Sequence, residues 1–222
     1  MKKISLLVIF TVIGFSLFAQ TENKPAAEPL SGDLLALQTA NSLARYGYSA
    51  QSASALIGAA EILAKIQTQP LGVQAERRQQ SGSTEVSTPE FTPAALLADA
   101  RRIAGRDATM IAWADEVQRS LNTRTRGVVG GPRSGTDVVS GRNSIFYQVG
   151  FVAGQRAEVI ISGNGASDLD LYIYDSNGNL ISYDEGYSDD AFASWVPRWT
   201  GQFTIEVRNC GPRANRFVLY TN

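Results

Sequence analysis

The chain has 222 residues, with 20 Lys and Arg, 21 Asp and Glu, one Cys and no His. Because acidic and basic residues nearly balance, the chain has no excess positive charge to attract phosphate groups, and we expect no nucleic-acid partner. The lack of histidine excludes Ser-His and Cys-His nucleophiles and His-ligated metal centres. A chain of this length can bury one or two hydrophobic cores without disulfide bonds.

The chain begins with the pattern of a secretory signal peptide. Lys2 and Lys3 precede an apolar run from Ile4 to Phe18, and the small residue Ala19 follows. A charged start, an apolar middle and a small residue at the cleavage point are typical of export signals. The pattern therefore predicts a signal peptide over residues 1–19.

Cleavage after residue 19 leaves 203 residues with 18 basic and 21 acidic side chains, a net charge of −3. Residues 20–32 are polar and contain proline, so they predict a disordered N-terminus and not the continuation of a membrane anchor. We expect the mature protein to be periplasmic or secreted, without stable membrane insertion.

Residues 33–122 are predicted to form a small α-helical bundle of two helix hairpins. Apolar residues recur at spacings of three and four in residues 33–67 and 92–121, and alanine is abundant there. Gly47 and Gly105 can each end a helix in the left-handed conformation. Two hairpins are too few for a stacked repeat array, so a bundle is the better interpretation.

Two segments have the amino-acid composition that is typical of linkers between structured parts. Residues 69–92 are rich in Gln, Ser, Thr and Pro, which predicts a flexible linker between the hairpins. This linker ends at Thr92-Pro93, a pair typical of a helix start. Residues 123–134 are rich in Gly and Arg and predict a joint to a second module.

From residue 135 to residue 222 the hydrophobic period becomes two. Phe203, Ile205 and Val207 alternate with polar residues, and Asn177-Gly178 between two apolar runs predicts a β-hairpin. Several short strands at this spacing indicate an all-β sandwich. The predicted fold class is therefore α+β in separate modules, an N-terminal helical bundle followed by a jelly-roll-type β-sandwich.

Three segments carry a family resemblance. They read SDLDLYIYDSNGNLISYDEG at residues 167–186, WTGQFTIEVRN at 199–209 and NRFVLYTN at 215–222. The acidic strand with its Asn-Gly turn, and the late strand that begins at Gly201, resemble the bacterial pre-peptidase C-terminal domain over about residues 135–222. The resemblance implies a jelly-roll-type sandwich that serves exported proteins as an accessory module.

The usual context of that family is missing, because the sequence contains no HExxH zinc motif and no serine nucleophile elbow. We assign no catalytic residue and expect the protein not to be an enzyme. Cys210 is the only cysteine, so it cannot form an internal disulfide bond, and we expect a small buried or half-buried thiol.

An acidic segment is the main candidate for a metal site. Residues 157–197 contain eight acids and no Lys or Arg. Calcium prefers six to eight oxygen ligands, and the related collagenase-type sandwich modules bind calcium. The candidate ligands are Asp168, Asp170, Asp175, Asp184, Asp189 and Asp190. The alternative is a solvated face in which Asp and Asn shape turns without an ion; calcium is therefore possible, and no cofactor is certain.

Three functions remain open at this stage. The leading hypothesis is an exported non-catalytic binding protein, with or without a stabilising calcium ion, whose sandwich recognises an extracytoplasmic protein or glycan. The second is a carboxylate-based hydrolase that acts on glycans with the acids of residues 184–190, because paired carboxylates cleave glycosidic bonds. The third is an accessory factor that acts in trans on a separately encoded secreted peptidase.

Overall fold

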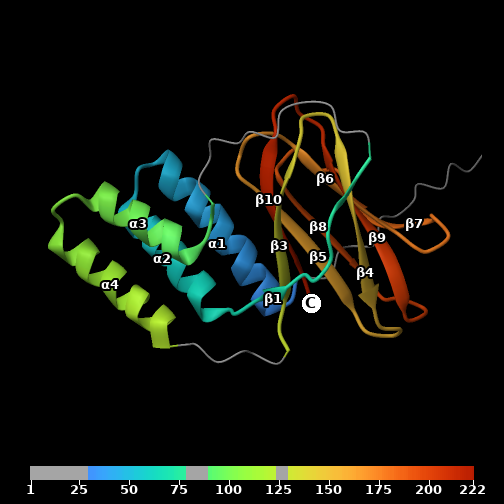
Figure 1. The fold of residues 1–222 in the computed structure, drawn as a ribbon, viewed down its shortest axis with the longest axis horizontal. Helices are drawn as coiled ribbons and strands as arrows, with labels where there is room; N and C mark the ends of the chain where they lie inside the picture. Colours follow the sequence, from blue (N-terminus) through green and yellow to red (C-terminus); the bar gives the residue numbers. More distant parts are fainter. Residues whose placement is uncertain (1–29, 79–89, 124–129) are drawn as a thin grey trace, which may run out of the picture.

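The computed structural model describes residues 30–78, 90–123 and 130–222, in which a group of helices lies beside a β-sandwich (Figure 1). The predicted signal peptide, most of the predicted N-terminal tail, and parts of the predicted linker and joint lie outside these residues. The α+β fold class, helices first and a sandwich second, is confirmed. Within the described ranges, no helix is both long enough and apolar enough to span a membrane.

Four helices form the two predicted hairpins, and side-chain capping explains where the second and third helices begin. The Ser52 and Thr92 side chains accept bonds from the backbone amides of Ala55 and Ala95, and Pro93 occupies the first turn of its helix. The helices are α1 (Gly32–Ser49), α2 (Ala53–Lys65), α3 (Pro93–Ala104) and α4 (Ala108–Thr123).

The two predicted helix-ending glycines have different roles. Gly105 ends α3 with a positive φ of +59°, as glycine allows, but its ψ of −100° lies outside the left-handed helical region that was predicted. Gly47 does not end α1, which continues to Ser49. A Cβ atom at Gly47 would lie 2.5 Å from Leu56 Cδ2, so this glycine lets α1 and α2 approach each other closely.

Two five-stranded sheets form the sandwich. Sheet A has the order β1-β3-β10-β5-β8 and sheet B the order β2-β4-β9-β6-β7. Their inward side chains form one apolar core that includes Phe203 and Phe217. The strands are β1 (Gln69–Pro70), β2 (Glu76–Arg77), β3 (Arg133–Val139), β4 (Ser144–Phe151), β5 (Ala157–Gly163), β6 (Leu169–Tyr174), β7 (Leu180–Asp184), β8 (Asp190–Trp195), β9 (Gly201–Asn209) and β10 (Asn215–Thr221).

The described part of the predicted linker differs from the expectation of a flexible segment. β1 pairs in parallel with β3, and β2 pairs antiparallel with β4, so residues 69–78 add an edge strand to each sheet. Leu71 lies between the two strands and is buried in the sandwich core. Two-residue strands carry no hydrophobic period, which is why composition alone indicated a linker.

The helical part and the sandwich share a buried interface. Leu34 and Leu37 of α1 pack against Ile160 of β5 and Tyr220 of β10, on the outer face of sheet A. The buried Asn41 amide donates to the Tyr220 hydroxyl at 3.1 Å. All seven residues of β5 are therefore buried, on the core side by sheet B and on the outer side by α1.

Candidate functional site

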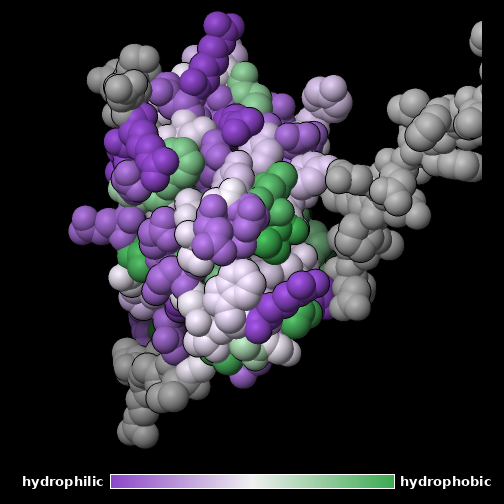
Figure 2. All heavy atoms as spheres, turned by 90° about the vertical axis from the view of Figure 1, so that its right-hand side faces the viewer, coloured by the Kyte–Doolittle hydropathy of each residue, from purple (hydrophilic) through white to green (hydrophobic). Residues whose placement is uncertain are grey.

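The two outer faces of the sandwich differ in what covers them. The helices lie on the side of sheet A, while β4, β9 and β7 of sheet B lie on the opposite side of the sandwich (Figure 1). Seen from the right-hand side of Figure 1, the surface is mostly polar, with small separate apolar areas (Figure 2). Among the described residues, none of the four helices covers the outer face of sheet B, and we take this face as the candidate binding surface.

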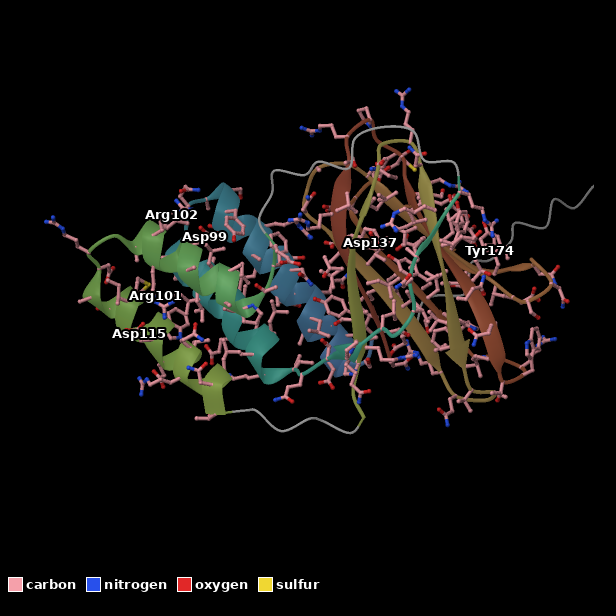
Figure 3. The ribbon with its side chains drawn as sticks, in the orientation of Figure 1. Asp99, Arg101, Arg102, Asp115, Asp137 and Tyr174 are labelled. Carbon is pink, nitrogen blue, oxygen red and sulfur yellow. The ribbon has the colours of Figure 1, made fainter. Side chains whose placement is uncertain are left out.

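A row of tyrosine rings crosses this face. Strand alternation directs Leu171 and Ile173 into the core, and Tyr172 and Tyr174 to the outer side of the sheet, where Tyr172 is buried and Tyr174 half-buried. The Tyr172 ring stacks with the rings of Tyr174 and Tyr183, at centroid distances of 6.4 Å in both cases. Tyr174 lies on the side of the sandwich away from the helices (Figure 3).

Next to this row lies a hollow of about 540 Å³, which we call the sheet-B groove. It combines aromatic faces with amide, hydroxyl and charged groups. The Arg78 guanidinium lies 4.5 Å from the centre of the Phe146 ring, and the Gln148 amide donates to Thr204 Oγ1 at 2.8 Å. Its lining residues are Arg78, Phe146, Gln148, Tyr174, Asp175, Ser176, Gly178, Gln202, Thr204 and Glu206.

A hydrogen-bond network fixes one wall of the groove. Glu206 is buried and accepts bonds from Ser144 Oγ at 2.7 Å, from Tyr174 Oη at 3.1 Å and from the Arg208 guanidinium at 3.0 Å. Arg208 also covers the Tyr172 ring, at 4.3 Å from its centre. Because both Glu206 oxygens accept bonds from the protein, this carboxylate orients the groove and is not a free acid or base.

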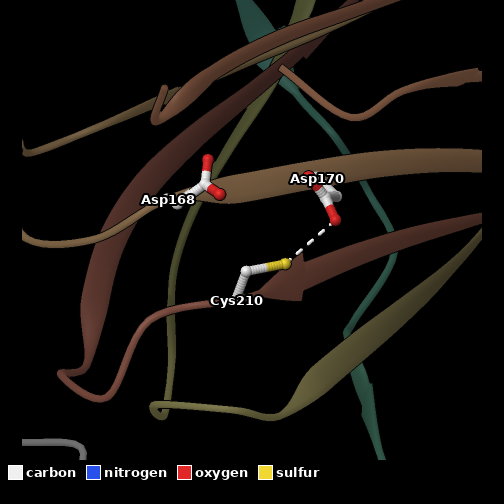
Figure 4. Close-up of side chains that lie close together, drawn as sticks. All are labelled: Asp168, Asp170 and Cys210. Carbon is white, nitrogen blue, oxygen red and sulfur yellow. Dashed lines mark hydrogen bonds between the residues drawn. The ribbon is translucent and has the colours of Figure 1, made fainter. Parts of the chain in front are cut away.

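Of the six predicted metal ligands, Asp168 and Asp170 lie together, beside Cys210 (Figure 4). One ligand atom from each of these three residues lies within 4.8 Å of the other two. The Cys210 thiol donates to Asp170 Oδ2 at 2.9 Å. Strand pairing brings them together, because Leu169 of β6 is opposite Asn209 of β9. No local sequence pattern indicates Cys210 as a neighbour, because 40 residues separate it from Asp170.

The electrostatics of this cluster are unfavourable for negative charge. Asp168 Oδ1 is buried and has no hydrogen-bond partner. Burial and the nearby Asp170 carboxylate raise the pKa of Asp168. Burial, the hydrogen bond to Asp170 and the two negative charges raise the pKa of the Cys210 thiol to about 12. The thiol is therefore held protonated. The residue as a whole is exposed, so the expectation of a small buried or half-buried residue at Cys210 is wrong.

Two of the other predicted ligands stabilise loops and strand ends. Asp175 Oδ1 accepts bonds from the backbone amides of Asn177 and Asn179, at 2.8 and 2.9 Å. Bonds from the Asn179 side chain and from these amides lower the pKa of Asp175. Asp184 Oδ2 accepts a bond from the Phe192 amide at 3.1 Å, which ties β7 to β8.

The remaining two, Asp189 and Asp190, join the sandwich to α1. The Arg45 guanidinium forms a salt bridge with Asp190, and its Nε lies 4.0 Å from Asp189 Oδ1. Asp189 also accepts a bond from the Gly165 amide, and Asp190 one from the Ser162 hydroxyl. The four acids outside the Asp168–Asp170 pair are thus each bonded to protein groups. Asp170 is bonded as well, because its Oδ2 accepts bonds from the Cys210 thiol at 2.9 Å and from the Tyr172 hydroxyl at 3.1 Å.

The donor set at Asp168 and Asp170 fits a hard cation in part. Two carboxylates, one with an unpartnered buried oxygen, are the ligand type that calcium prefers. A protonated thiol is not a calcium ligand, since sulfur favours softer metals. Any calcium ion here would be held by these two carboxylates and not by the six acids named from the sequence, and calcium binding stays a prediction.

No protein-family model matches the sequence, and no curated protein matches it. Among solved structures, the chain is similar to the pre-peptidase C-terminal domain of a collagenase from Bacillus anthracis, with a TM-score of 0.37, 9% identity, and coverage of 42% of this chain and 91% of that one. It is also similar to PliG, a periplasmic inhibitor of g-type lysozyme from Aeromonas hydrophila, with a TM-score of 0.33, 14% identity, and coverage of 41% and 84%.

A third likeness is to xylanase 10B from Clostridium thermocellum, with a TM-score of 0.22, 12% identity, and coverage of 40% of this chain and 24% of that one. At these scores and identities, none of the likenesses assigns a family or a function to the chain. The β-sandwich that the sequence resemblance implied is present, and membership of the pre-peptidase C-terminal family stays a prediction.

The raised pKa of Cys210 predicts an unreactive thiol. At about pH 8, iodoacetamide should alkylate the folded protein far more slowly than the chain in guanidinium, where a thiol has its ordinary pKa of about 8.5. Asp170→Asn removes the negative charge beside the thiol, which lowers the thiol pKa, so alkylation should become at least about tenfold faster. Asp184→Asn is the matched control and should leave the rate unchanged. Equal rates in the folded and unfolded wild-type protein would contradict this account.

Proposed function

We propose that the chain is an exported, non-catalytic binding protein that binds a glycan through the sheet-B groove. The proposal rests mainly on one observation, the combination in this groove of aromatic rings with side-chain amides and hydroxyls. Sugar rings present apolar C–H faces that pack on aromatic rings, and hydroxyls that exchange hydrogen bonds with such polar groups. The predicted export signal supports a periplasmic or secreted location for this activity.

The charges at the groove support binding without cleavage. Glycoside hydrolysis needs two carboxyl groups, one on each side of the scissile bond, that can exchange protons with substrate or water. Asp175 and Glu206 line the groove, but each accepts several hydrogen bonds from the protein. Both are therefore structural groups in this proposal, and the acids of residues 184–190 are bonded elsewhere.

The groove polarity also makes a sugar a better fit than an apolar peptide segment. Gln148 and Gln202 are exposed amides at its edge, and Phe146 and Tyr174 supply half-buried rings. A protein partner, including a secreted peptidase on which the chain acts in trans, is the alternative outcome of the test below.

The test measures binding of the full mature chain to a panel of soluble glycans, namely xylan, cellulose, chitin and peptidoglycan oligosaccharides, by calorimetry. Tyr174→Ala removes a ring of the groove and should weaken binding by about three- to tenfold, the effect of one aromatic contact. Tyr187→Ala is the matched control, because Tyr187 is 102% exposed and does not line the groove.

Two results would contradict glycan binding: no binding to any glycan of the panel, or equal affinities of the wild type and Tyr174→Ala. Capture of an extracytoplasmic protein that is lost in Tyr174→Ala would instead assign the groove to a protein partner.

We also propose that calcium stabilises the sandwich at Asp168 and Asp170. Millimolar calcium should then raise the midpoint of thermal unfolding, and a chelator should lower it. Asp168→Asn should abolish this response. Without calcium the same change should raise the midpoint, because the raised pKa of Asp168 means that its charged form is disfavoured in the folded state at neutral pH.

Asp175→Asn is the control for the calcium test, since Asp175 stabilises only its own turn. This variant should unfold at a lower temperature and keep the calcium response. A wild-type midpoint that is the same with calcium and with chelator would contradict the calcium proposal and leave the glycan proposal standing.

A further inference from the structure

A second hollow lies where the helical part meets the sandwich. It has a volume of about 470 Å³, within the range of small-ligand sites. Both parts of the fold contribute to it, which is a frequent position for binding sites. We call it the junction groove; its lining residues are Arg45, Tyr46, Tyr48, Ser49, Phe91, Asn164 and Gly165.

Aromatic rings dominate the helical wall of the junction groove. The rings of Tyr48 and Phe91 stack at a centroid distance of 5.8 Å with an interplanar angle of 16°. The Tyr48 hydroxyl donates to Asp99 at 2.9 Å, which holds its ring in place from α3. Tyr46, at the rim, is 60% exposed, so its ring is accessible to a ligand.

The one cationic side chain in the lining is already neutralised. Arg45 Nη1 donates to Gly163 O at 2.8 Å and to Asp190 Oδ1 at 3.1 Å, and its Nη2 donates to Ser42 Oγ and to Asp190. These bonds occupy the two terminal nitrogens of the guanidinium. Arg45 therefore forms part of the floor of the junction groove and does not present a free positive charge to a ligand.

The remaining electrostatics favour a positive ligand over a negative one. The groove lies at the C-terminal end of α1, the negative end of the helix dipole, and the last turn of α1 carries no basic residue. Asp99 and Arg102, paired on α3, balance each other (Figure 3). The aromatic faces add the negative side of their quadrupoles.

We propose that the junction groove binds a quaternary ammonium group against the rings of Tyr46, Tyr48 and Phe91. Such a cation is weakly hydrated and bulky, and it is attracted to aromatic faces. A metal ion fits less well, because the nearby Asp99 and Asp190 carboxylates accept bonds from Tyr48, Arg102 and Arg45. This inference stands on the junction groove alone and does not depend on glycan binding at the sheet-B groove.

The test is an NMR titration of the full mature chain with choline and with its neutral isostere 3,3-dimethyl-1-butanol. The two molecules have the same shape, so the difference between them reports the charge. Choline should bind saturably, and the alcohol should bind at least about fivefold more weakly, as expected for a cation–π contact. Equal binding of both molecules, or no saturable binding of choline, would overturn the proposal.

Variants locate the site and separate ring electrostatics from apolar contact. Tyr46→Leu and Phe91→Leu keep an apolar side chain but remove the ring, and each should weaken choline binding by about two- to fivefold. Tyr187→Leu, which changes an exposed ring outside the groove, should have no effect. Unchanged affinity in both groove variants would contradict the assignment. Tyr174→Ala should leave choline binding intact, which separates this site from the sheet-B groove.

Discussion

The packing of α1 on the outer face of sheet A is the constraint on which the rest of the structure depends. Leu34 and Leu37 bury Ile160 and Tyr220 on the outer face of sheet A. Without α1 this face would be exposed to solvent, whereas with it the sheet is covered on both sides. The Arg45–Asp190 pair and the Asn41–Tyr220 bond fix the helix in one position on the sheet. The helical part is therefore held against the sandwich as well as attached by the chain.

This arrangement decides where ligands can reach the sandwich. Within the part of the chain that the structure describes, the helices cover sheet A and not the outer face of sheet B, where the side chains form an ordered network around Glu206 and Arg208. The same docking of α1 creates the junction groove, because the end of α1 carries Tyr46 and Tyr48 past the β5–β6 loop. One packing interaction thus explains the position of the two proposed grooves, and it assigns Asp189 and Asp190 to holding α1.

Patterns that depend on local geometry were predictable from the sequence, and contacts between distant residues were not. The alternation of Phe203, Ile205 and Val207 predicted a strand because their burial in a sandwich preserves a period of two. Thr92-Pro93 predicted the start of α3 because capping is local. In contrast, β1 and β2 are too short to have a period, and the approach of Cys210 to Asp170 depends on the register of β6 and β9. The calcium interpretation likewise grouped six acids by sequence proximity. In the fold, Asp168 and Asp170 lie beside Cys210, and the other four bind a turn, the end of a neighbouring strand or α1.

The free energy of unfolding of Leu37→Ala tests the central claim most directly, with Leu35→Ala on the same helix as control. Leu37 is 1% exposed at the helix–sheet interface, and Leu35 is 51% exposed. Unfolding is followed by helical circular dichroism and, in a Trp113→Phe background where Trp195 and Trp199 report the sandwich, by tryptophan fluorescence. The two signals should show one shared transition, destabilised by about 2–5 kcal/mol in Leu37→Ala and by less than about 0.5 kcal/mol in Leu35→Ala. Equal, small effects of both changes, or helices that unfold separately from the sandwich, would contradict the account.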